Sequence, residues 1–415
     1  MTHRSPRSPG SPRLDSGTTW MLVATVLAAV AAYLFLLVVG RVLGTEDFAP
    51  LTALWTIQGL IFTTVFMPME QLTVRRLNLD TPGATPWRLY LWVISATALG
   101  ATAFAAATLS RLFTGHWAYL PIMAALIAGY GAFAIGRGYL AGRRRFKDYA
   151  LVTLSESALR LALAGVLLAL SVGALGLGWT LVAGALVVWA WRPLHGERQR
   201  AAGALPEAGA GGDLATFVTA NAAAQTLVWA GPLVVGGLGA EAAEVSVFFQ
   251  TFLLLRAPLT VAYNLVSRVL PPFTRLVEEG EAAALRRLAI GIAATGAALA
   301  AAGFAVGYWV GPPLVELLLG AEYRPEPLLA ALAASGAILA TVALFAQQMI
   351  IALRATGRLA AAWLAGLAAA GVLVAVASAG PSLRVGWAFL VGEGLAFALL
   401  VAIALTARPR AARTS

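Results

Sequence analysis

Five charged residues fall well inside long apolar stretches of this chain, and these are the residues whose types could do chemistry. Two are arginines, Arg160 and Arg256, and three are glutamates, Glu70, Glu156 and Glu393. A charge at the centre of a bilayer costs about 2.5–3.5 kcal/mol on insertion scales, so it is retained where it faces a polar cavity or a charged partner. We therefore expect the function of the protein to depend on these five side chains.

Arg256 lies in the middle of the apolar run 248–266, two residues before Pro258. Its guanidinium group is permanently charged and presents a planar fork that suits phosphate or carboxylate oxygens. One interpretation is an anion-binding site in a central cavity, and the other is an ion pair with Glu70 or Glu156. Pro258 removes a backbone donor, so it predicts a bend or hinge beside the arginine.

Glu156 and Arg160 are four residues apart, in the order that favours an ion pair within one helix. They are either a self-neutralised couple or a site at which Arg160 exchanges Glu156 for a substrate phosphate. The two interpretations remain open on spacing alone.

Glu70 follows Pro68, which predicts a second hinge, and precedes Arg75 by five residues. It is interpreted as a gate partner of the neighbouring arginines or as a site for a cation or proton. Glu393 stands between two glycines, which permit close approach of another helix. We therefore predict that it forms a buried hydrogen bond to that helix.

The elements that must position these residues are transmembrane helices. The 415-residue chain is 60% apolar and only 12% charged, with a mean hydropathy of +0.81, which excludes an ordinary water-soluble protein. A membrane span needs about 20 apolar residues. Twelve such runs are found, at 18–39, 50–71, 87–109, 117–136, 150–170, 172–191, 214–237, 245–266, 287–310, 327–352, 359–378 and 384–406.

The distribution of basic residues predicts the orientation of these spans, because Lys and Arg accumulate on cytoplasmic loops. The tails and even-numbered loops hold 23 basic residues, including Arg75, Arg137 and Arg143, against four on the other side: Arg41, Arg111, Arg324 and Arg384. We therefore predict a cytoplasmic-membrane protein with both termini in the cytoplasm. The net charge of +10 then reflects topology and contact with anionic lipid headgroups, and no nucleic-acid partner is expected.

The chain lacks the residues that several kinds of catalytic or metal site require. The chain has no cysteine, which excludes disulfides and thiolate sites. Its three histidines, His3, His116 and His195, lie outside the predicted spans, and no P-loop, paired-carboxylate or nucleophile motif occurs. We expect no enzymatic activity, no metal site and no cofactor.

The predicted domains are two six-span lobes, 18–191 and 214–406, joined by a cytoplasmic linker at 192–213. Residues 1–17 and 407–415 are predicted cytoplasmic tails, the first of them disordered, and the first apolar run is interpreted as a retained span. A weak internal repeat relates the lobes: 43–46 (LGTE) after the first span resembles 238–241 (LGAE) after the seventh. Two lobes of the same orientation with a cleft between them are typical of transporters.

Several segments together resemble the multidrug/oligosaccharidyl-lipid/polysaccharide (MOP) flippase superfamily, specifically its bacterial polysaccharide-biosynthesis, O-antigen flippase-like branch. The resemblance covers roughly residues 18–360. It rests on the order of four loose motifs: 41–48 (RVLGTEDF); 68–71 with Arg75; 138–142 (GYLAG) through Phe146 and Tyr149 to Glu156 and Arg160; and Arg256-Ala257-Pro258 through 270–271 to Arg275.

The resemblance implies a V-shaped bundle that alternates between inward-open and outward-open states. The implied substrate is a polyprenyl-pyrophosphate-linked oligosaccharide, moved from the inner to the outer leaflet for cell-surface polysaccharide biosynthesis. Arg256 and Arg160 would hold its pyrophosphate. The implied partners are the phospholipid membrane and the glycosyltransferases or polymerase of such a pathway.

Two alternatives stay open. A cation-coupled multidrug exporter of the same superfamily typically carries a carboxylate in span one or seven, but 18–39 has no acid and span seven offers only Asn221 and Gln225. A non-transporting membrane scaffold for glycan assembly is the other.

Overall fold

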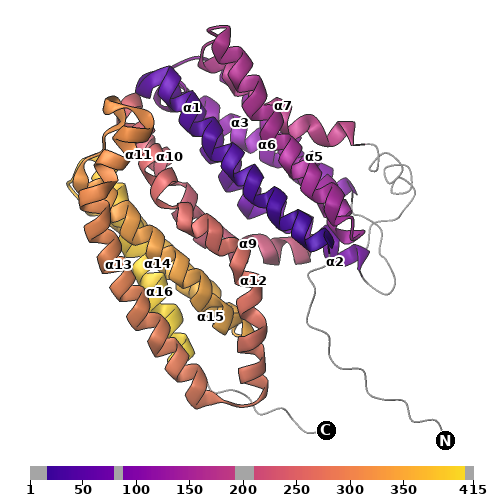
Figure 1. Cartoon of the computed structure of the whole chain (residues 1–415), viewed down its shortest axis with the longest axis vertical. Helices are drawn as coiled ribbons and strands as arrows, with labels where there is room; N and C mark the ends of the chain where they lie inside the picture. The colour runs from indigo at the N-terminus through magenta and orange to yellow at the C-terminus, as the bar shows by residue number, and fades with distance from the viewer. Residues whose placement is uncertain (1–15, 79–86, 192–209, 407–415) are drawn as a thin grey trace, which may run out of the picture.

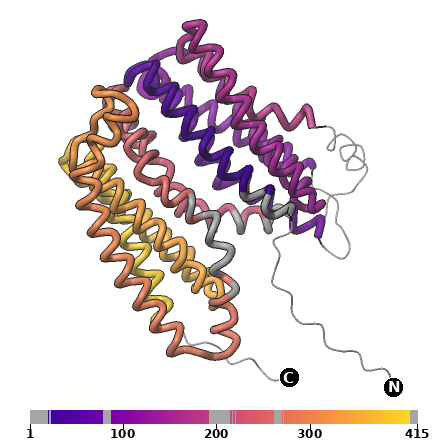
Figure 2. Tube along the Cα trace, in the orientation of Figure 1, coloured from indigo at the N-terminus to yellow at the C-terminus, as the bar shows by residue number. Residues whose placement is uncertain are grey.

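The computed structural model describes residues 16–78, 87–191 and 210–406, and these are almost entirely helical (Figure 1). The predicted C-terminal tail at 407–415, residues 1–15 of the predicted N-terminal tail at 1–17, and most of the predicted linker, 192–209, lie outside the described residues and are grey in Figure 2. The apolar composition explains the helices, because a chain segment in lipid must satisfy its backbone hydrogen bonds internally. In the described part no strand occurs.

The N-terminal bundle is built from the first half of the chain. Its elements are α1 (Ser16–Ile61), the π-helix η1 (Phe62–Phe66), α2 (Met67–Leu77), α3 (Trp87–Ala107), α4 (Leu109–Leu112), α5 (Tyr119–Gly142), α6 (Phe146–Ala169), α7 (Ala174–Leu186) and the 3-10 turn η2 (Val187–Ala190).

The C-terminal bundle follows. Its elements are α9 (Ala210–Trp229), α10 (Gly231–Gly237), α11 (Ala242–Leu255), α12 (Ala257–Glu278), α13 (Ala282–Leu319), the 3-10 turn η3 (Ala321–Tyr323), α14 (Pro327–Ala352), α15 (Thr356–Val376) and α16 (Pro381–Thr406). α9 begins at Ala210, inside the stretch predicted as linker.

The predicted all-α, two-lobe fold is confirmed. Eight described helical stretches are long and apolar enough to cross a membrane, and one of them, Val23–Leu77, has 55 residues and contains the first two predicted spans. Spans six, seven and eight fall outside this count because their helices are short or interrupted, as at α9–α10 and α11–α12. The two bundles form a V whose arms separate toward the end that carries the α12–α13 turn (Figure 1).

The repeat predicted from 43–46 and 238–241 has a counterpart in the backbone. Gly44 breaks α1 with φ 77°, and Gly239 separates α10 from α11 with φ 90°. Glycine adopts this left-handed region without the steric penalty that a Cβ brings. At each glycine the chain leaves one helix and enters the next, so a left-handed glycine separates two helical segments in both halves.

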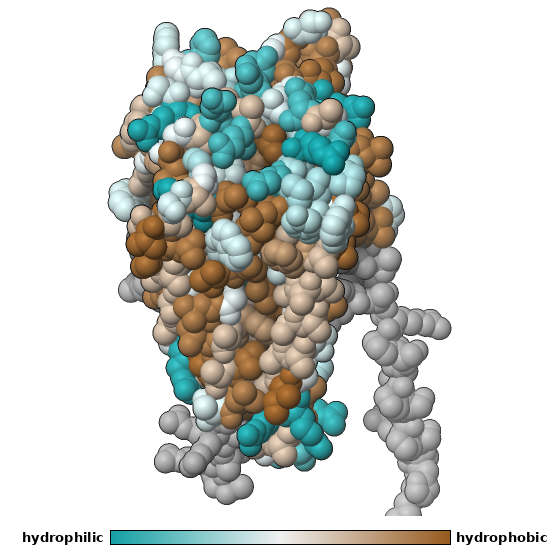
Figure 3. All heavy atoms as spheres, turned by 90° about the vertical axis from the view of Figure 1, so that its left-hand side faces the viewer, coloured by the Kyte–Doolittle hydropathy of each residue, from teal (hydrophilic) through white to brown (hydrophobic). Residues whose placement is uncertain are grey.

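The outer surface is apolar in the middle. Large side chains such as Trp92, Leu99, Trp309 and Val376 are strongly exposed on α3, α13 and α15. On the face that includes α13, apolar side chains fill the middle while hydrophilic ones gather toward both ends (Figure 3). Such a band matches the hydrocarbon layer of a membrane.

The two bundles contact each other at the end of the V that includes the break in α1. Arg41 Nη1 donates to the carbonyl oxygen of Leu318 at 3.1 Å, and Tyr323 Oη donates to that of Gly40 at 2.8 Å. Arg111 Nη1 donates to the carbonyl oxygen of Gly237 at 2.7 Å. Arg41 and Arg111 are two of the four arginines predicted on the outer side, so this contact closes the end predicted to face outward.

Candidate functional site

Arg256 occupies the break between α11 and α12. Its backbone, with φ −89° and ψ 3°, leaves the helical region, and Pro258 stands in the first turn of α12. Pro258 has no N–H to offer the preceding turn, so the ladder stops here. The predicted bend therefore has a structural basis, while its movement during transport stays a prediction.

The side chain of Arg256 contacts the end of α9. Its Nη1 donates to the carbonyl oxygen of Val228 at 2.9 Å, and its guanidinium lies 4.3 Å from the ring centroid of Trp229. The C-terminal end of a helix carries partial negative charge, and an aromatic face attracts a cation. A helix end and a ring thus help to stabilise this charge, while Glu70 and Glu156, the partners considered from the sequence, pair with Arg137 and Arg160.

Arg256 also lines a pocket of about 170 Å³ between α9, α10, α11, α15 and α16. The other lining side chains are mainly apolar, with Phe248, Phe252 and Phe389 prominent, and Arg256 is the charged residue among them. Thr56 of α1 joins the lining from the N-terminal bundle, and its hydroxyl is buried without a hydrogen-bond partner. The pocket therefore offers one cation and two threonine residues, Thr56 and Thr226, on a mainly apolar wall.

The second membrane arginine, Arg160, forms the pair expected from its spacing. Its Nη1 lies 2.6 Å from Oε1 of Glu156, and the same nitrogen donates to Tyr130 Oη at 3.0 Å. The guanidinium packs over Trp55 at 4.6 Å and Phe35 at 5.3 Å from the ring centroids. Only 3% of the Arg160 side chain is exposed, so this structure shows the self-neutralised couple.

One stretch of α1 connects the two arginine sites. Trp55 packs on Arg160, and the next residue, Thr56, lines the pocket of Arg256. One turn further, a Cβ placed on Gly59 would lie only 2.4 Å from the Trp229 ring, which carries Arg256 on its face. The backbone of α1 at Gly59 therefore sets the position of Trp229.

Gly59→Ala is expected to lower the stability of the protein by about 1–3 kcal/mol, the usual effect of overpacking, because the methyl group must displace the Trp229 ring. The measurement is the thermal unfolding midpoint of the purified protein. Gly165→Ala in α6 is the control, because a Cβ there meets nothing within 4 Å. An unchanged midpoint for Gly59→Ala would contradict the close contact.

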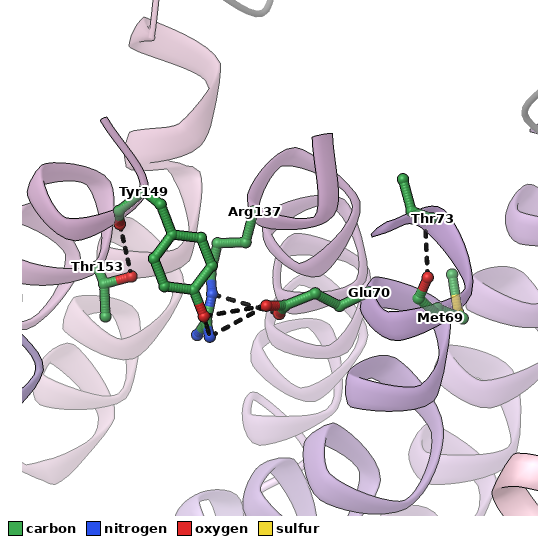
Figure 4. A network of polar contacts seen from close by, with 6 residues as sticks. All are labelled: Met69, Glu70, Thr73, Arg137, Tyr149 and Thr153. Atoms are coloured by element: carbon green, nitrogen blue, oxygen red, sulfur yellow. Dashed lines mark hydrogen bonds and ion pairs between the residues drawn. The ribbon is translucent and has the colours of Figure 1, made fainter. Parts of the chain in front are cut away.

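Glu70 belongs to a third charged cluster, near the end of the N-terminal bundle (Figure 4). Arg137 Nε lies 3.3 Å from Oε2 of Glu70, and Tyr149 Oη donates to Oε1 at 3.0 Å. Arg137 also donates to Tyr149 and lies over the rings of Tyr149, Phe133 and Phe62.

Arg137 is a correction to the sequence analysis, which placed it in a cytoplasmic loop. The helix α5 continues to Gly142, six residues beyond the predicted span end. The Arg137 side chain is only 15% exposed. Arg75, the gate partner considered for Glu70, is exposed near the end of α2. Pro68 lies in the first turn of α2, directly after the π-helix at Phe62–Phe66.

Glu393 is fully buried in α16, and the hydrogen bond expected for it is absent. Neither carboxyl oxygen has a hydrogen-bond partner among the described residues. The expectation was wrong because the helices that enclose Glu393 offer it apolar surface. In the part of the chain that the structure describes, no group of three or more His, Asp or Glu side chains could hold a metal ion.

Comparisons with known proteins place the fold. No model of a protein family matches the chain. An uncharacterized protein of Mycobacterium bovis and another of Mycobacterium tuberculosis are each 25% identical over 354 residues, which is 79% of this chain and 78% of theirs.

Among solved structures, an inward-facing multidrug resistance MATE family transporter of the MOP superfamily matches with a TM-score of 0.58 and 15% identity, over 93% of this chain and 97% of the transporter. The lipid II flippase MurJ in an inward closed conformation also matches with a TM-score of 0.58, at 13% identity, over 92% of this chain and 86% of MurJ. The chain therefore has the fold of MOP-superfamily transporters.

Proposed function

We propose that this protein is an alternating-access membrane transporter whose cargo is an amphipathic anion. The observation that carries this proposal is Arg256, which stands at a helix break and lines an otherwise apolar pocket. A cation beside apolar surface suits a cargo that has an anionic group and a hydrocarbon portion. The fold, with two bundles meeting in a V, supports a transport cycle in which the bundles rock against each other.

Within this class the best candidate is a polyprenyl-pyrophosphate-linked oligosaccharide, flipped from the inner to the outer leaflet. A guanidinium group can bind two phosphate oxygens at once, and such charge-assisted bonds are about twice as strong as neutral ones. The prenyl chain would stay in lipid, and the sugars would occupy the space between the arms of the V. This candidate rests on the motif resemblance together with the arginine site.

Arg160 is the proposed second phosphate ligand, and it must first leave Glu156. Both arginines flank the same stretch of α1, so a shift of that stretch would move both sites. Exchange of Glu156 for a phosphate would replace one charged partner by another. We expect this exchange in a conformation other than the one seen here.

The proposed location is the cytoplasmic membrane, with both termini in the cytoplasm. In this orientation the contacts of Arg41, Arg111 and Tyr323 close the outer side, and the arms of the V separate toward the cytoplasm. The structure would then represent the state that receives cargo from the inner leaflet. Glycosyltransferases or a polymerase of polysaccharide assembly are the proposed partners.

A cation-coupled exporter of small amphipathic compounds is the second candidate, because a multidrug MATE transporter and MurJ match the fold equally well by TM-score. The pocket argues against a cationic cargo, since its charged residue is an arginine. The two candidates therefore predict opposite charge preferences.

The test is translocation in proteoliposomes that contain the purified protein. We expect a labelled prenyl-pyrophosphate sugar to cross the bilayer faster than in protein-free vesicles, and a cationic dye to cross at the protein-free rate. Transport of the dye but not of the anionic lipid would overturn the proposal in favour of the exporter. Transport of neither, with retained capture of glycan-assembly enzymes, would favour a scaffold.

A further inference from the structure

Glu393 is a buried acidic residue that has no role in the proposed cargo site. It lies in the middle of α16, its exposed fraction is 0%, and both of its oxygens lack a hydrogen-bond partner. A buried carboxylate without a partner is strongly disfavoured as an anion, and such groups take up a proton instead. The burial of Glu393 therefore favours the neutral, protonated form of its carboxyl group.

The packing around Glu393 leaves little room for water. A Cβ on the preceding Gly392 would lie 2.8 Å from Leu227 and 3.1 Å from Ala370, and one on Gly366 would lie 2.5 Å from the Gly392 carbonyl oxygen. These contacts bring α15 and α9 close to α16. Because the Glu393 side chain is itself 0% exposed, bulk water does not reach its carboxyl group in this conformation.

The face of α16 that carries Glu393 itself packs on α13 and α14 through aromatic side chains. Phe389, four residues before Glu393, covers Gly336, and Phe397, four residues after it, covers Gly296. Residues four apart share one face of a helix. Glu393 thus stands between two aromatic contacts on an apolar interface.

Among the residues that the structure describes, no basic side chain forms a hydrogen bond or ion pair with the Glu393 carboxyl group. The sequences of α14 and α10 contain no titratable residue. Five other elements supply titratable residues: α13, α11, α9, α15 and α16 itself. Those of α13 and α15 are exposed or half-buried: Arg286, Arg287, Tyr308, Glu316 and Arg358. Glu244 of α11 accepts a bond from the Ser382 N–H, and the remaining residues are Arg256 at the end of α11, Asp213 of α9 and Arg384 of α16. None of the described side chains among them is bonded to Glu393.

We propose that Glu393 is a proton-binding site of the C-terminal bundle, protonated in the conformation seen here. A metal cation is a poorer occupant, because hard cations need about six oxygen ligands and the described residues form no acidic cluster. The proton can exchange with water only when α16 separates from α14 or α15, so its binding and release report on that movement.

The site adjoins the pocket of Arg256. Ala388 and Phe389 of α16 line that pocket, and so do Leu227 and Ala370, the two residues that Gly392 touches. Cargo that changes this packing would change access to Glu393, and by reciprocity protonation would change the affinity for cargo. This coupling rests on the proposed function, whereas the proton site itself does not.

The experiment is infrared spectroscopy of the full-length protein in lipid, compared between wild type, Glu393→Gln and Glu156→Gln. We expect the wild type at pH 7 to show the carbonyl stretch of a protonated carboxyl group, Glu393→Gln to lack it, and Glu156→Gln to retain it. Glu393→Gln has nearly the shape of the protonated acid, so the variant should fold. Identical spectra for wild type and Glu393→Gln would overturn the proposal.

The pH dependence of thermal unfolding is the second measurement. A glutamate in an unfolded chain ionises above about pH 4.3. If folded Glu393 retains its proton, the wild type must lose stability as the pH rises above that value, while Glu393→Gln does not. Parallel profiles of stability against pH for the two proteins would contradict a proton site. So would a stabilisation by sodium over potassium that disappears in Glu393→Gln. Neither measurement requires a transported substrate.

Discussion

Arg256→Ala is expected to slow translocation of a prenyl-pyrophosphate sugar about ten- to hundredfold at low substrate concentration. Hydrogen bonds to a charged group contribute about 1.5–3 kcal/mol each, and every 1.4 kcal/mol corresponds to about tenfold in affinity. The alanine also removes the cation that rests on Trp229 and leaves the wall of the pocket entirely uncharged. The measurement is the initial rate in proteoliposomes over a range of substrate concentrations.

Two further variants separate charge from geometry. Arg256→Lys keeps the positive charge but loses the planar fork, so we expect a smaller reduction than for alanine. Arg275→Ala is the matched control, since this arginine also belongs to the α12 region but is exposed and bonded to Glu279. A rate for Arg256→Ala equal to that of Arg275→Ala, with both proteins folded, would remove the anion site from the proposal.

The residue type at position 256 could be read from the sequence, but its contacts could not. A lone arginine in an apolar run predicts a compensating group, and the sequence offered glutamates for that purpose. Its described partners include the Val228 carbonyl and the Trp229 ring. Neither is charged, and which helix end meets Arg256 depends on how α9 packs against α11 and α12.

Local spacing served better than long-range pairing throughout the molecule. The pair Glu156–Arg160 follows from one helical turn. The short repeat aligned Gly44 with Gly239, and the structure shows that both have a left-handed φ. By contrast, the contact of Arg137 with Glu70 joins positions 67 residues apart on different helices.

The place of Arg137 inside a helix was missed because the predicted fourth span, 117–136, was ended directly before this first charged residue. The residues after it, 138–142 (GYLAG), are apolar or small and continue the helix to Gly142. Their apolar character is the sequence signal that could have extended the span, and the structure does bury Tyr139 and Leu140. A charge near a span end is therefore assigned more safely from the residues that follow it than from the charge alone.

Arg160→Met is expected to destabilise the protein by about 3–5 kcal/mol, the usual effect of removing one partner from a buried ion pair. Methionine keeps much of the side-chain volume over Trp55 and Phe35, so the loss comes mainly from the carboxylate that remains. Glu156 would still accept bonds from Tyr130 and Ser157, but no cation would balance it.

The double variant Glu156→Gln with Arg160→Met tests this reason. Because it removes both charges, most of the lost stability should return, and unfolding of the two single variants and the double variant gives their coupling energy. If the double variant is as unstable as Arg160→Met alone, packing of the guanidinium on Trp55 and Phe35 is the main contribution. In that case exchange of Glu156 for a phosphate could proceed with the guanidinium held in place, since the rings and not the carboxylate would determine its position.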